Sequence, residues 1–102
     1  MKQPKQYTID VTINGHKVSR VLIGRHYELK HGHYMDDDLI LSLIRLLDNK
    51  KFPVDSITKE IEYYVADIEY GAPTKIYRLI WLFEGEMLEV IGIINAYRRR
   101  KK

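Results

Sequence analysis

The chain has 102 residues, the length of a single domain, and it contains no cysteine. An apolar share of 45% excludes a disordered chain, and the lack of cysteine excludes a disulfide framework or a thiolate metal site. No apolar run approaches the roughly 20 residues that cross a bilayer, and the N-terminus has no apolar signal core. We therefore expect a cytoplasmic protein without a membrane partner.

The net charge of +3 is unevenly distributed. Residues 1–6 and 98–102 are predicted to be flexible basic ends of one domain spanning 1–102, and together they carry seven of the 17 basic residues. The remaining body has 10 basic against 14 acidic residues, a net charge of −4. The basic C-terminal run either binds an anion locally or serves as a solubilising tail.

The first predicted elements are two strands joined by a tight turn. Apolar and polar residues alternate over 7–13, and a β-rich run resumes over 18–23. Between them stands Asn14-Gly15, a strong hairpin signal because both residues tolerate the positive φ of the turn. We expect a β-hairpin that is closed by Gly24.

Two helices are expected after the hairpin. Residues 25–31 can form a short helix ended by Gly32, the usual residue for a left-handed cap. Asp36 is a good N-cap for a second helix. Leucines and isoleucines at three- and four-residue spacing then predict an amphipathic helix through about Asn49.

Three strands are expected in the remainder of the chain. Residues 60–70 alternate, with a change of phase near Ala66 that indicates a bulge. Residues 76–83 and 87–96 are almost continuously apolar, and a short turn joins them as a second hairpin. Runs that are apolar on both faces belong at the centre of a sheet that a helix covers. The predicted fold is α+β: a twisted antiparallel sheet of about five strands, with one main helix and a short helix on one face.

The densest cluster of chemically versatile side chains surrounds the short helix. It contains His26, Lys30, His31 and His33, and His26 and Lys30 share a face if the segment is helical. A histidine titrates near neutral pH, so it can take a proton from a ribose 2′-hydroxyl or give one to a leaving oxygen. Lys30 would hold the phosphate. Alternatively, these are solvated side chains on a connecting loop.

The end of the last strand is a second candidate site. Alternation places Asn95, Tyr97 and Arg99 on one face and Ala96 and Arg98 on the other. Tyr97 is a candidate acid, base or stacking platform, and the two arginines are candidate phosphate clamps. The alternative is a frayed strand end with charged residues in water.

Arg78 interrupts an otherwise apolar strand, on the face that it shares with Ile80 and Leu82. Arginine is rarely buried without a partner. We therefore expect either an anion site or an ion pair with Glu62 or Glu89, and we favour the ion pair.

The histidine cluster also contains ligand types that metals use. His26, His31 and His33 lie close in sequence to Asp36–Asp38, and imidazole with carboxylate suits zinc or manganese. The spacing matches no standard metal motif, and carboxylates have a simpler role at a helix N-terminus. We therefore expect no metal and no cofactor.

These segments resemble small toxins of the RelE superfamily. Lys30-His31-Gly32 stands before a helix, three antiparallel strands follow, and the last strand ends in Asn95-Ala96-Tyr97-Arg98. The BrnT-like branch is the most similar, because its KHG segment precedes a helix and its final strand ends in Ser-Ala-Arg. The resemblance covers roughly residues 25–99. It implies a RelE-like ribonuclease fold and a metal-independent toxin that an antitoxin protein holds inactive.

The expected function is an endoribonuclease that cleaves by attack of a 2′-hydroxyl on the adjacent phosphate. His26 or His31 would be the general base, and the other histidine or Tyr97 the acid. Lys30 and Arg98 would clamp the phosphate. Further substrate-binding residues would be Arg78, Asn95 and Arg99. The expected partners are RNA, a cognate antitoxin and, if cleavage depends on it, the ribosome.

Two other functions are consistent with the sequence. In a non-catalytic binding module, such as the partner protein of a nuclease or a nucleic-acid adaptor, the acidic stretch 55–69 would meet a basic partner. Its basic end would then bind nucleic acid with salt-sensitive affinity. A metal-dependent nuclease is the third candidate, and it would lose activity to a chelator.

Overall fold

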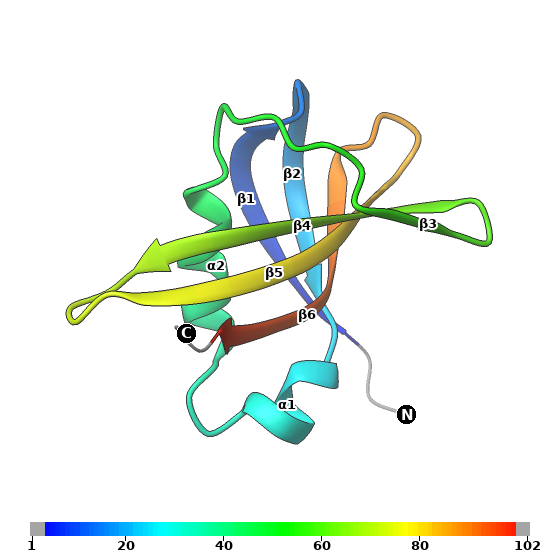
Figure 1. Cartoon of the computed structure of the whole chain (residues 1–102). Coiled ribbons are helices and arrows are strands. Elements are labelled where there is room, and N and C mark those ends of the chain that lie inside the picture. The colour runs from blue at the N-terminus through cyan, green and yellow to red at the C-terminus, as the bar shows by residue number, and fades with distance from the viewer. Residues whose placement is uncertain (1–3, 100–102) are drawn as a thin grey trace.

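The framework of the protein is a six-stranded sheet with the strand order β1-β2-β6-β5-β4-β3 (Figure 1). The computed structural model describes residues 4–99. Neighbouring strands are antiparallel, except that β2 and β6 run parallel. The elements in chain order are β1 (Lys5–Ile13), β2 (His16–Ile23), α1 (His26–His31), α2 (Asp37–Arg45), β3 (Ser56–Thr58), β4 (Ile61–Tyr70), β5 (Lys75–Glu84) and β6 (Val90–Arg99).

The α+β class is confirmed, but the predicted sheet of about five antiparallel strands needs correction. The structure adds the short strand β3 and makes the sheet mixed through the parallel β2–β6 pair. β3 has only three residues, all exposed, so it leaves no hydrophobic pattern in the sequence. The parallel pair joins elements far apart in the chain, and no turn signal marks such a pairing.

Three local predictions were wrong. Gly32 has a φ of −63° and is therefore not a left-handed cap. α2 ends at Arg45, and turns rather than helix lead to Asn49. The β4–β5 register is continuous through Ala66, so the predicted bulge is absent there, and an irregularity lies instead between Ile80 and Trp81.

The β1–β2 hairpin confirms the predicted tight turn at Asn14-Gly15. Asn14 and Gly15 adopt φ values of 55° and 79°, the positive values that the tight turn requires. Residues 5–6 and 98–99, which were predicted to belong to flexible ends, lie instead in β1 and β6. The rest of the basic C-terminal run, like residues 1–3, lies outside the described residues.

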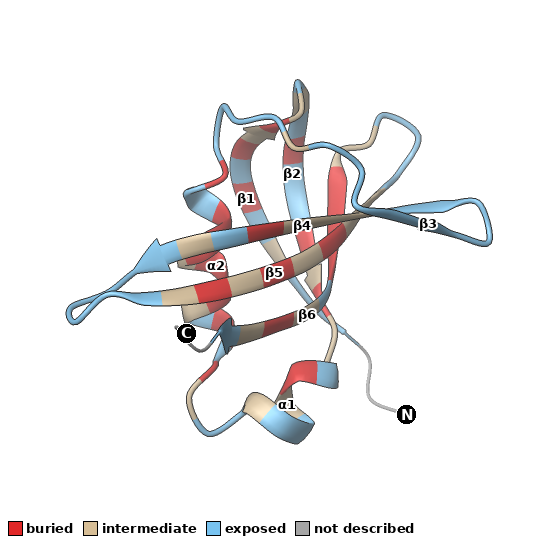
Figure 2. Ribbon diagram, viewed as in Figure 1, coloured by how far each residue is buried: buried red, intermediate tan, exposed pale blue. Residues whose placement is uncertain are grey.

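α2 covers one face of the strongly twisted sheet (Figure 1). Its buried residues Ile40, Leu43 and Ile44 belong to the same core as Leu79 and Trp81 of β5. Figure 2 shows buried and less buried positions alternating along β5, because successive side chains point to opposite faces. The opposite, open face of β4, β5 and β6 is therefore available for a site. No helix among residues 4–99 is long and apolar enough to span a membrane.

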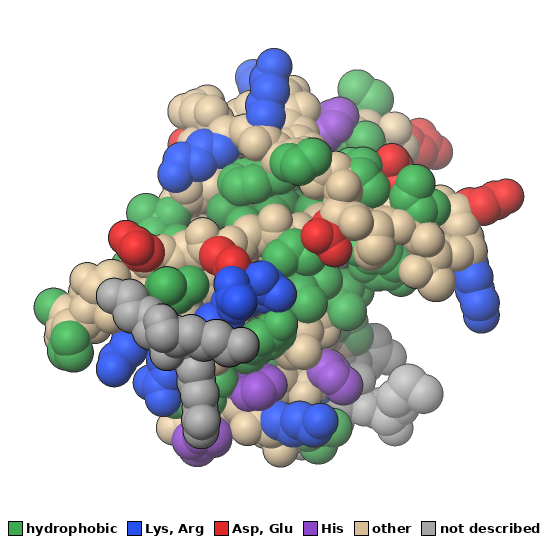
Figure 3. All heavy atoms as spheres, viewed as in Figure 1, with side chains coloured by type: hydrophobic (Ala, Val, Ile, Leu, Met, Phe, Trp, Pro, Cys, Tyr) green, Lys and Arg blue, Asp and Glu red, His purple; other side chains and the backbone are tan. Residues whose placement is uncertain are grey.

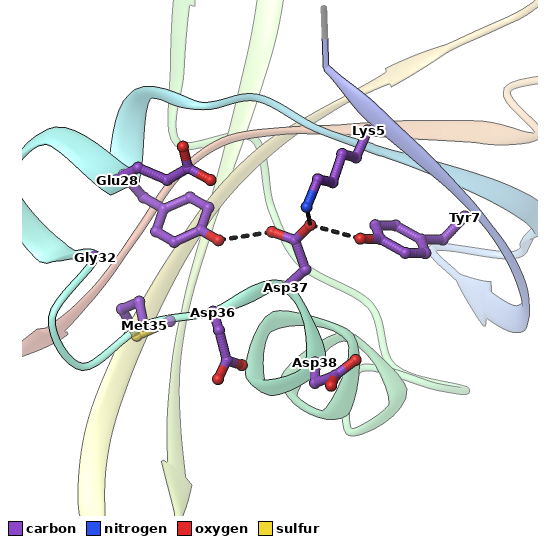
Figure 4. Close-up of a pocket in the computed structure, with 9 residues that line it drawn as sticks. Lys5, Tyr7, Glu28, Gly32, Met35, Asp36, Asp37 and Asp38 are labelled. Carbon is purple, nitrogen blue, oxygen red and sulfur yellow. Dashed lines mark hydrogen bonds and ion pairs between the residues drawn. The ribbon is translucent and has the colours of Figure 1, made fainter.

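A buried carboxylate joins both helices to the first strand. Asp37, at the start of α2, accepts hydrogen bonds from the hydroxyls of Tyr27 in α1 (2.6 Å) and Tyr7 in β1 (2.5 Å), and the ammonium of Lys5 lies 3.5 Å away (Figure 4). Burial opposes the charge on Asp37, but these partners outweigh it and lower the pKa of the carboxyl. We call Asp37, Tyr7, Tyr27 and Lys5 the Asp37 clamp; it fixes α1 against the rest of the fold.

The Asp37→Asn variant tests the clamp. An amide keeps the shape but has one acceptor oxygen for two tyrosine hydroxyls, so we expect a loss of about 1–3 kcal/mol in the free energy of unfolding at pH 7. Folding lowers the pKa of Asp37, so the ionised carboxylate stabilises the folded state. This stabilisation is complete at pH values above 3.8, the ordinary pKa of the group, and is lost as the pH falls through the lowered pKa of the folded state. Urea unfolding of both proteins from pH 7 to pH 3 should show the difference shrinking below about pH 4.

Exposed Asp10 supplies the control, since Asp10→Asn should leave stability nearly unchanged. A difference between wild type and Asp37→Asn that stays constant with pH would contradict the role of the ionised carboxylate.

Candidate functional site

The site forms where α1 meets the second half of β6. β2 pairs with β6 only over Val90–Ile93, and the Gly24 N–H then donates to the Ile93 carbonyl at 3.3 Å. Beyond this point the chain leaves β2 and forms α1, which contacts β6. The Arg98 backbone N–H donates to the Tyr34 hydroxyl at 3.0 Å, so the segment after α1 is fastened to the end of β6.

His31 is half-buried between two tyrosines. Its Nδ1 lies 2.9 Å from the Tyr34 hydroxyl, and its ring stacks on Tyr97 with 5.4 Å between ring centroids. Burial lowers the pKa of His31, and the positive charges of Lys30, His33 and His26 lower it further. The neutral imidazole is therefore favoured near neutral pH, which is the form that accepts a proton.

Tyr34 can orient that imidazole for proton transfer. Its hydroxyl oxygen already accepts the Arg98 N–H and has a second lone pair. When Nδ1–H of His31 donates to this lone pair, Nε2 carries no proton and can act as a base. His31 thus has both features of a general base: a neutral form that is favoured and a partner that fixes its ring.

Two arginines share one carboxylate on the open face of the sheet. Arg78 binds Asp67 through Nε at 2.8 Å and Nη2 at 3.1 Å, and Arg99 Nη1 lies 2.7 Å from the same carboxyl group. Hydrogen bonding from Arg78 and Arg99 lowers the pKa of Asp67 in spite of burial. Asp67 in turn raises the pKa of Arg78, with a smaller contribution from Tyr97. The predicted ion pair of Arg78 therefore exists, but with Asp67 rather than Glu62 or Glu89.

These groups make a continuous polar row across the sheet. Asp67, Arg78 and Tyr97 are direct cross-strand partners on β4, β5 and β6, and His31 stacks on Tyr97 from α1. We call His31, Tyr97, Arg78, Asp67 and Arg99 the polar row. Figure 3 shows the open face, with basic and acidic side chains near its middle and histidines below them. Two arginines and one carboxylate leave the row with a net positive charge for an anion, with His31 neutral.

The other predicted site residues are arranged differently. Arg98 projects from the opposite side of β6, and its guanidinium lies over the Tyr34 ring at 4.5 Å from the centroid. Asn95 accepts a hydrogen bond from the Ala96 N–H at 2.9 Å. His26 and Lys30 are exposed on α1 and make no side-chain hydrogen bond or ion pair within residues 4–99. The structure therefore brings together His31, Tyr97, Arg78 and Arg99, with Arg98 beside them on Tyr34.

Sequence reasoning missed Asp67 and Tyr34. Asp67 was one member of an acidic stretch, and only the β4–β5 register identifies it as the partner of Arg78. Tyr34 contacts Arg98 across 64 positions of the chain, so no local spacing could have revealed its role.

The histidines and aspartates near α1 do not gather around a common point. Asp36 caps α2 by accepting from the Leu39 N–H at 2.7 Å, and Asp37 belongs to the Asp37 clamp. Within residues 4–99, no three histidine, aspartate or glutamate side chains are grouped so that they could hold a metal ion.

No protein-family model matches the chain, and comparisons with curated proteins and with solved structures give no match either. The geometry of the polar row is therefore the basis for a functional proposal.

The titration of His31 tests the geometry directly. We expect its pKa, followed by NMR, to lie below the ordinary histidine value of 6.5. Tyr97→Ala should raise the pKa of His31 because it uncovers the ring. Lys30→Gln should raise it by less, because it removes one nearby positive charge. A His31 pKa that is unmoved by Tyr97→Ala would show that the ring is not buried by this stack.

Proposed function

We propose that the protein is a metal-independent endoribonuclease of the RelE-like toxin type, acting in the cytoplasm under the control of an antitoxin protein. The observation that carries this proposal is the half-buried His31, held by Tyr34 and Tyr97 beside Arg78 and Arg99. A favoured neutral imidazole next to cationic groups suits the abstraction of a proton near a phosphate.

The proposed reaction begins with proton transfer to His31 Nε2 from a ribose 2′-hydroxyl. The 2′-oxygen then attacks the adjacent phosphorus, and the bond from phosphorus to the 5′-oxygen breaks. Tyr97 is the proposed donor of a proton to the leaving oxygen, with exposed His26 as the alternative. The products are a 2′,3′-cyclic phosphate and a 5′-hydroxyl, and no water is consumed in this step.

Arg78 and Arg99 are the proposed ligands of the scissile phosphate. Each still has free N–H donors, because Asp67 takes only two from Arg78 and one from Arg99. Positive charge at these atoms would stabilise the negative charge that develops on the phosphate oxygens. Lys30, next to His31 in the chain, and Arg98, which lies over Tyr34, are the proposed ligands of flanking phosphates. Asn95 shares the face of Tyr97 and would contact a neighbouring nucleotide.

A non-catalytic RNA-binding or protein-binding module is the second candidate. The observation that favours it is the full engagement of Asp67 with both arginines, which leaves less cationic charge for a transition state. Under this function the row would bind nucleic acid without cleaving it, on or off the ribosome.

Cleavage of a mixed RNA by the purified protein decides between the candidates. We expect 2′,3′-cyclic ends in the presence of EDTA and a loss of about 10²–10⁴-fold in rate for His31→Ala. His33→Ala is the matched control, because His33 is exposed and its ring makes a T-shaped contact with Tyr34. Its rate should stay within about twofold of wild type.

Equal rates for the two variants would refute the role of His31. A loss of activity to EDTA would indicate a metal-dependent nuclease. RNA binding without cleavage, in a chain that is also harmless when expressed in cells, would favour the binding module.

Asp67→Asn tests the assignment of the phosphate ligands. An amide holds the two arginines less strongly, so we expect tighter RNA binding and a steeper decrease of affinity with salt. Because the side chains of Arg78, Asp67 and Arg99 are 30%, 33% and 46% exposed, the cost to the free energy of unfolding should be below about 1 kcal/mol. Fluorescence anisotropy with a labelled single-stranded RNA measures the affinity, and Glu69→Gln, on an exposed carboxylate two residues away, is the control. Unchanged or weaker binding would show that the arginines do not contact RNA.

A further inference from the structure

A second surface lies at the other end of the same strands. It is formed by the β3–β4 hairpin and the loop between β5 and β6, residues 55–62 and 84–89. These two segments contain six carboxylates and a single basic residue, Lys59. We call this surface the acidic end; its carboxylates belong to Asp55, Glu60, Glu62, Glu84, Glu86 and Glu89.

The carboxylates of the acidic end are not neutralised inside the molecule. The ion pairs within residues 4–99 use Asp37, Glu28 and Asp67, none of which belongs to the acidic end. Like charges that are close together and unpaired repel one another, so an added cation lowers the energy of this surface. The charge therefore favours a basic partner and disfavours RNA or an anionic membrane.

Exposed apolar side chains accompany these carboxylates. Met87 is 77% exposed, Ile57 65% and Ile61 44%. A hollow of about 260 Å³ lies between the two segments and is lined by Glu60, Ile61, Glu62, Tyr64, Phe83 and Leu88. Its lining combines four apolar or aromatic side chains with two glutamates. Figure 3 shows hydrophobic and acidic side chains gathered over this end of the sheet.

We infer that the acidic end is a docking surface for a basic amphipathic segment of another protein. Aliphatic side chains of that segment would enter the hollow and cover Met87, and flanking lysines or arginines would meet the glutamates, as when a helix binds in a groove. A second copy of this chain fits less well, because its own basic run, residues 98–102, has no apolar residue to fill the hollow. The inference does not depend on ribonuclease activity.

A synthetic peptide of about 15 residues provides the probe, with leucines at helical i, i+3, i+4, i+7 spacing and lysines elsewhere. Its binding to the full chain is measured by fluorescence anisotropy, beside a scrambled peptide of equal composition. We expect the amphipathic peptide to bind more tightly than the scrambled one, with an affinity that falls as salt is added. Equal binding of both peptides, or none up to about 1 mM, would overturn the inference.

Matched variants locate the binding surface. Glu86→Lys should lower the affinity for the peptide about fivefold. Asp10→Lys makes the same change in net charge at an exposed site in β1, and its affinity should stay within about twofold of wild type. Met87→Ser should lower the affinity for the peptide about tenfold. Leu29→Ser, which replaces an 83% exposed leucine on α1, should leave the affinity unchanged. All four replaced side chains are exposed, so thermal unfolding should confirm an intact fold.

If a control variant lowers the affinity for the peptide as much as its counterpart does, the peptide is attracted nonspecifically to the whole protein. The acidic end is then not the docking surface. Sedimentation of the chain alone tests the other occupant. A dimer that Met87→Ser dissociates would make a second copy the partner and overturn the inference.

Discussion

The parallel pairing of β2 with β6 is the constraint on which the candidate site depends. It holds an early strand beside the last one over only four residue pairs, and then the two strands separate. The edge of β6 that β2 leaves uncovered is occupied by α1 and by Tyr34, which accepts the Arg98 N–H. His31 and Tyr97, 66 positions apart in the sequence, can therefore stack. Without this crossover, the histidines near α1 would have no strand end to face.

The charge of the molecule is divided along β4, β5 and β6. Arg78 of the polar row and Glu84 of the acidic end lie six positions apart on β5, about 20 Å at the rise of an extended strand. That separation exceeds the Debye length at physiological ionic strength, so each end presents its own field to a partner. Nucleic acid would be attracted to one end and repelled from the other. A protein bound at the acidic end would leave the polar row open, and the two surfaces can therefore serve different partners at once.

Local patterns predicted the elements well and their assembly less well. Asn14-Gly15, the N-cap Asp36 and the apolar runs of β5 and β6 are each encoded by neighbouring residues, and the structure confirms them. The alternation at the end of β6 also predicted that Tyr97 and Arg99 share a face. Asp67, Tyr34 and the β2–β6 pair depend on contacts between distant segments, and a single sequence carries no local signal for them. The sequence therefore indicated which residues have suitable chemistry, whereas the register of the sheet decides which of them meet.

The position of His31 depends on contacts from outside its own helix. α1 has six residues, and a helix of that length has little stability by itself. One side of α1 is fastened by Tyr27 to the carboxylate of Asp37, and the chain after it is fastened by Tyr34 to β6. These two attachments hold His31 between Tyr34 and Tyr97, where burial lowers the pKa of its imidazole. A proton transfer tolerates errors of well under 1 Å in the position of the base, so loosening either attachment would impair the proposed chemistry before it unfolds the domain. The Asp37 clamp is thus a positioning element for the site, although none of its residues touches the polar row in the contacts described for residues 4–99.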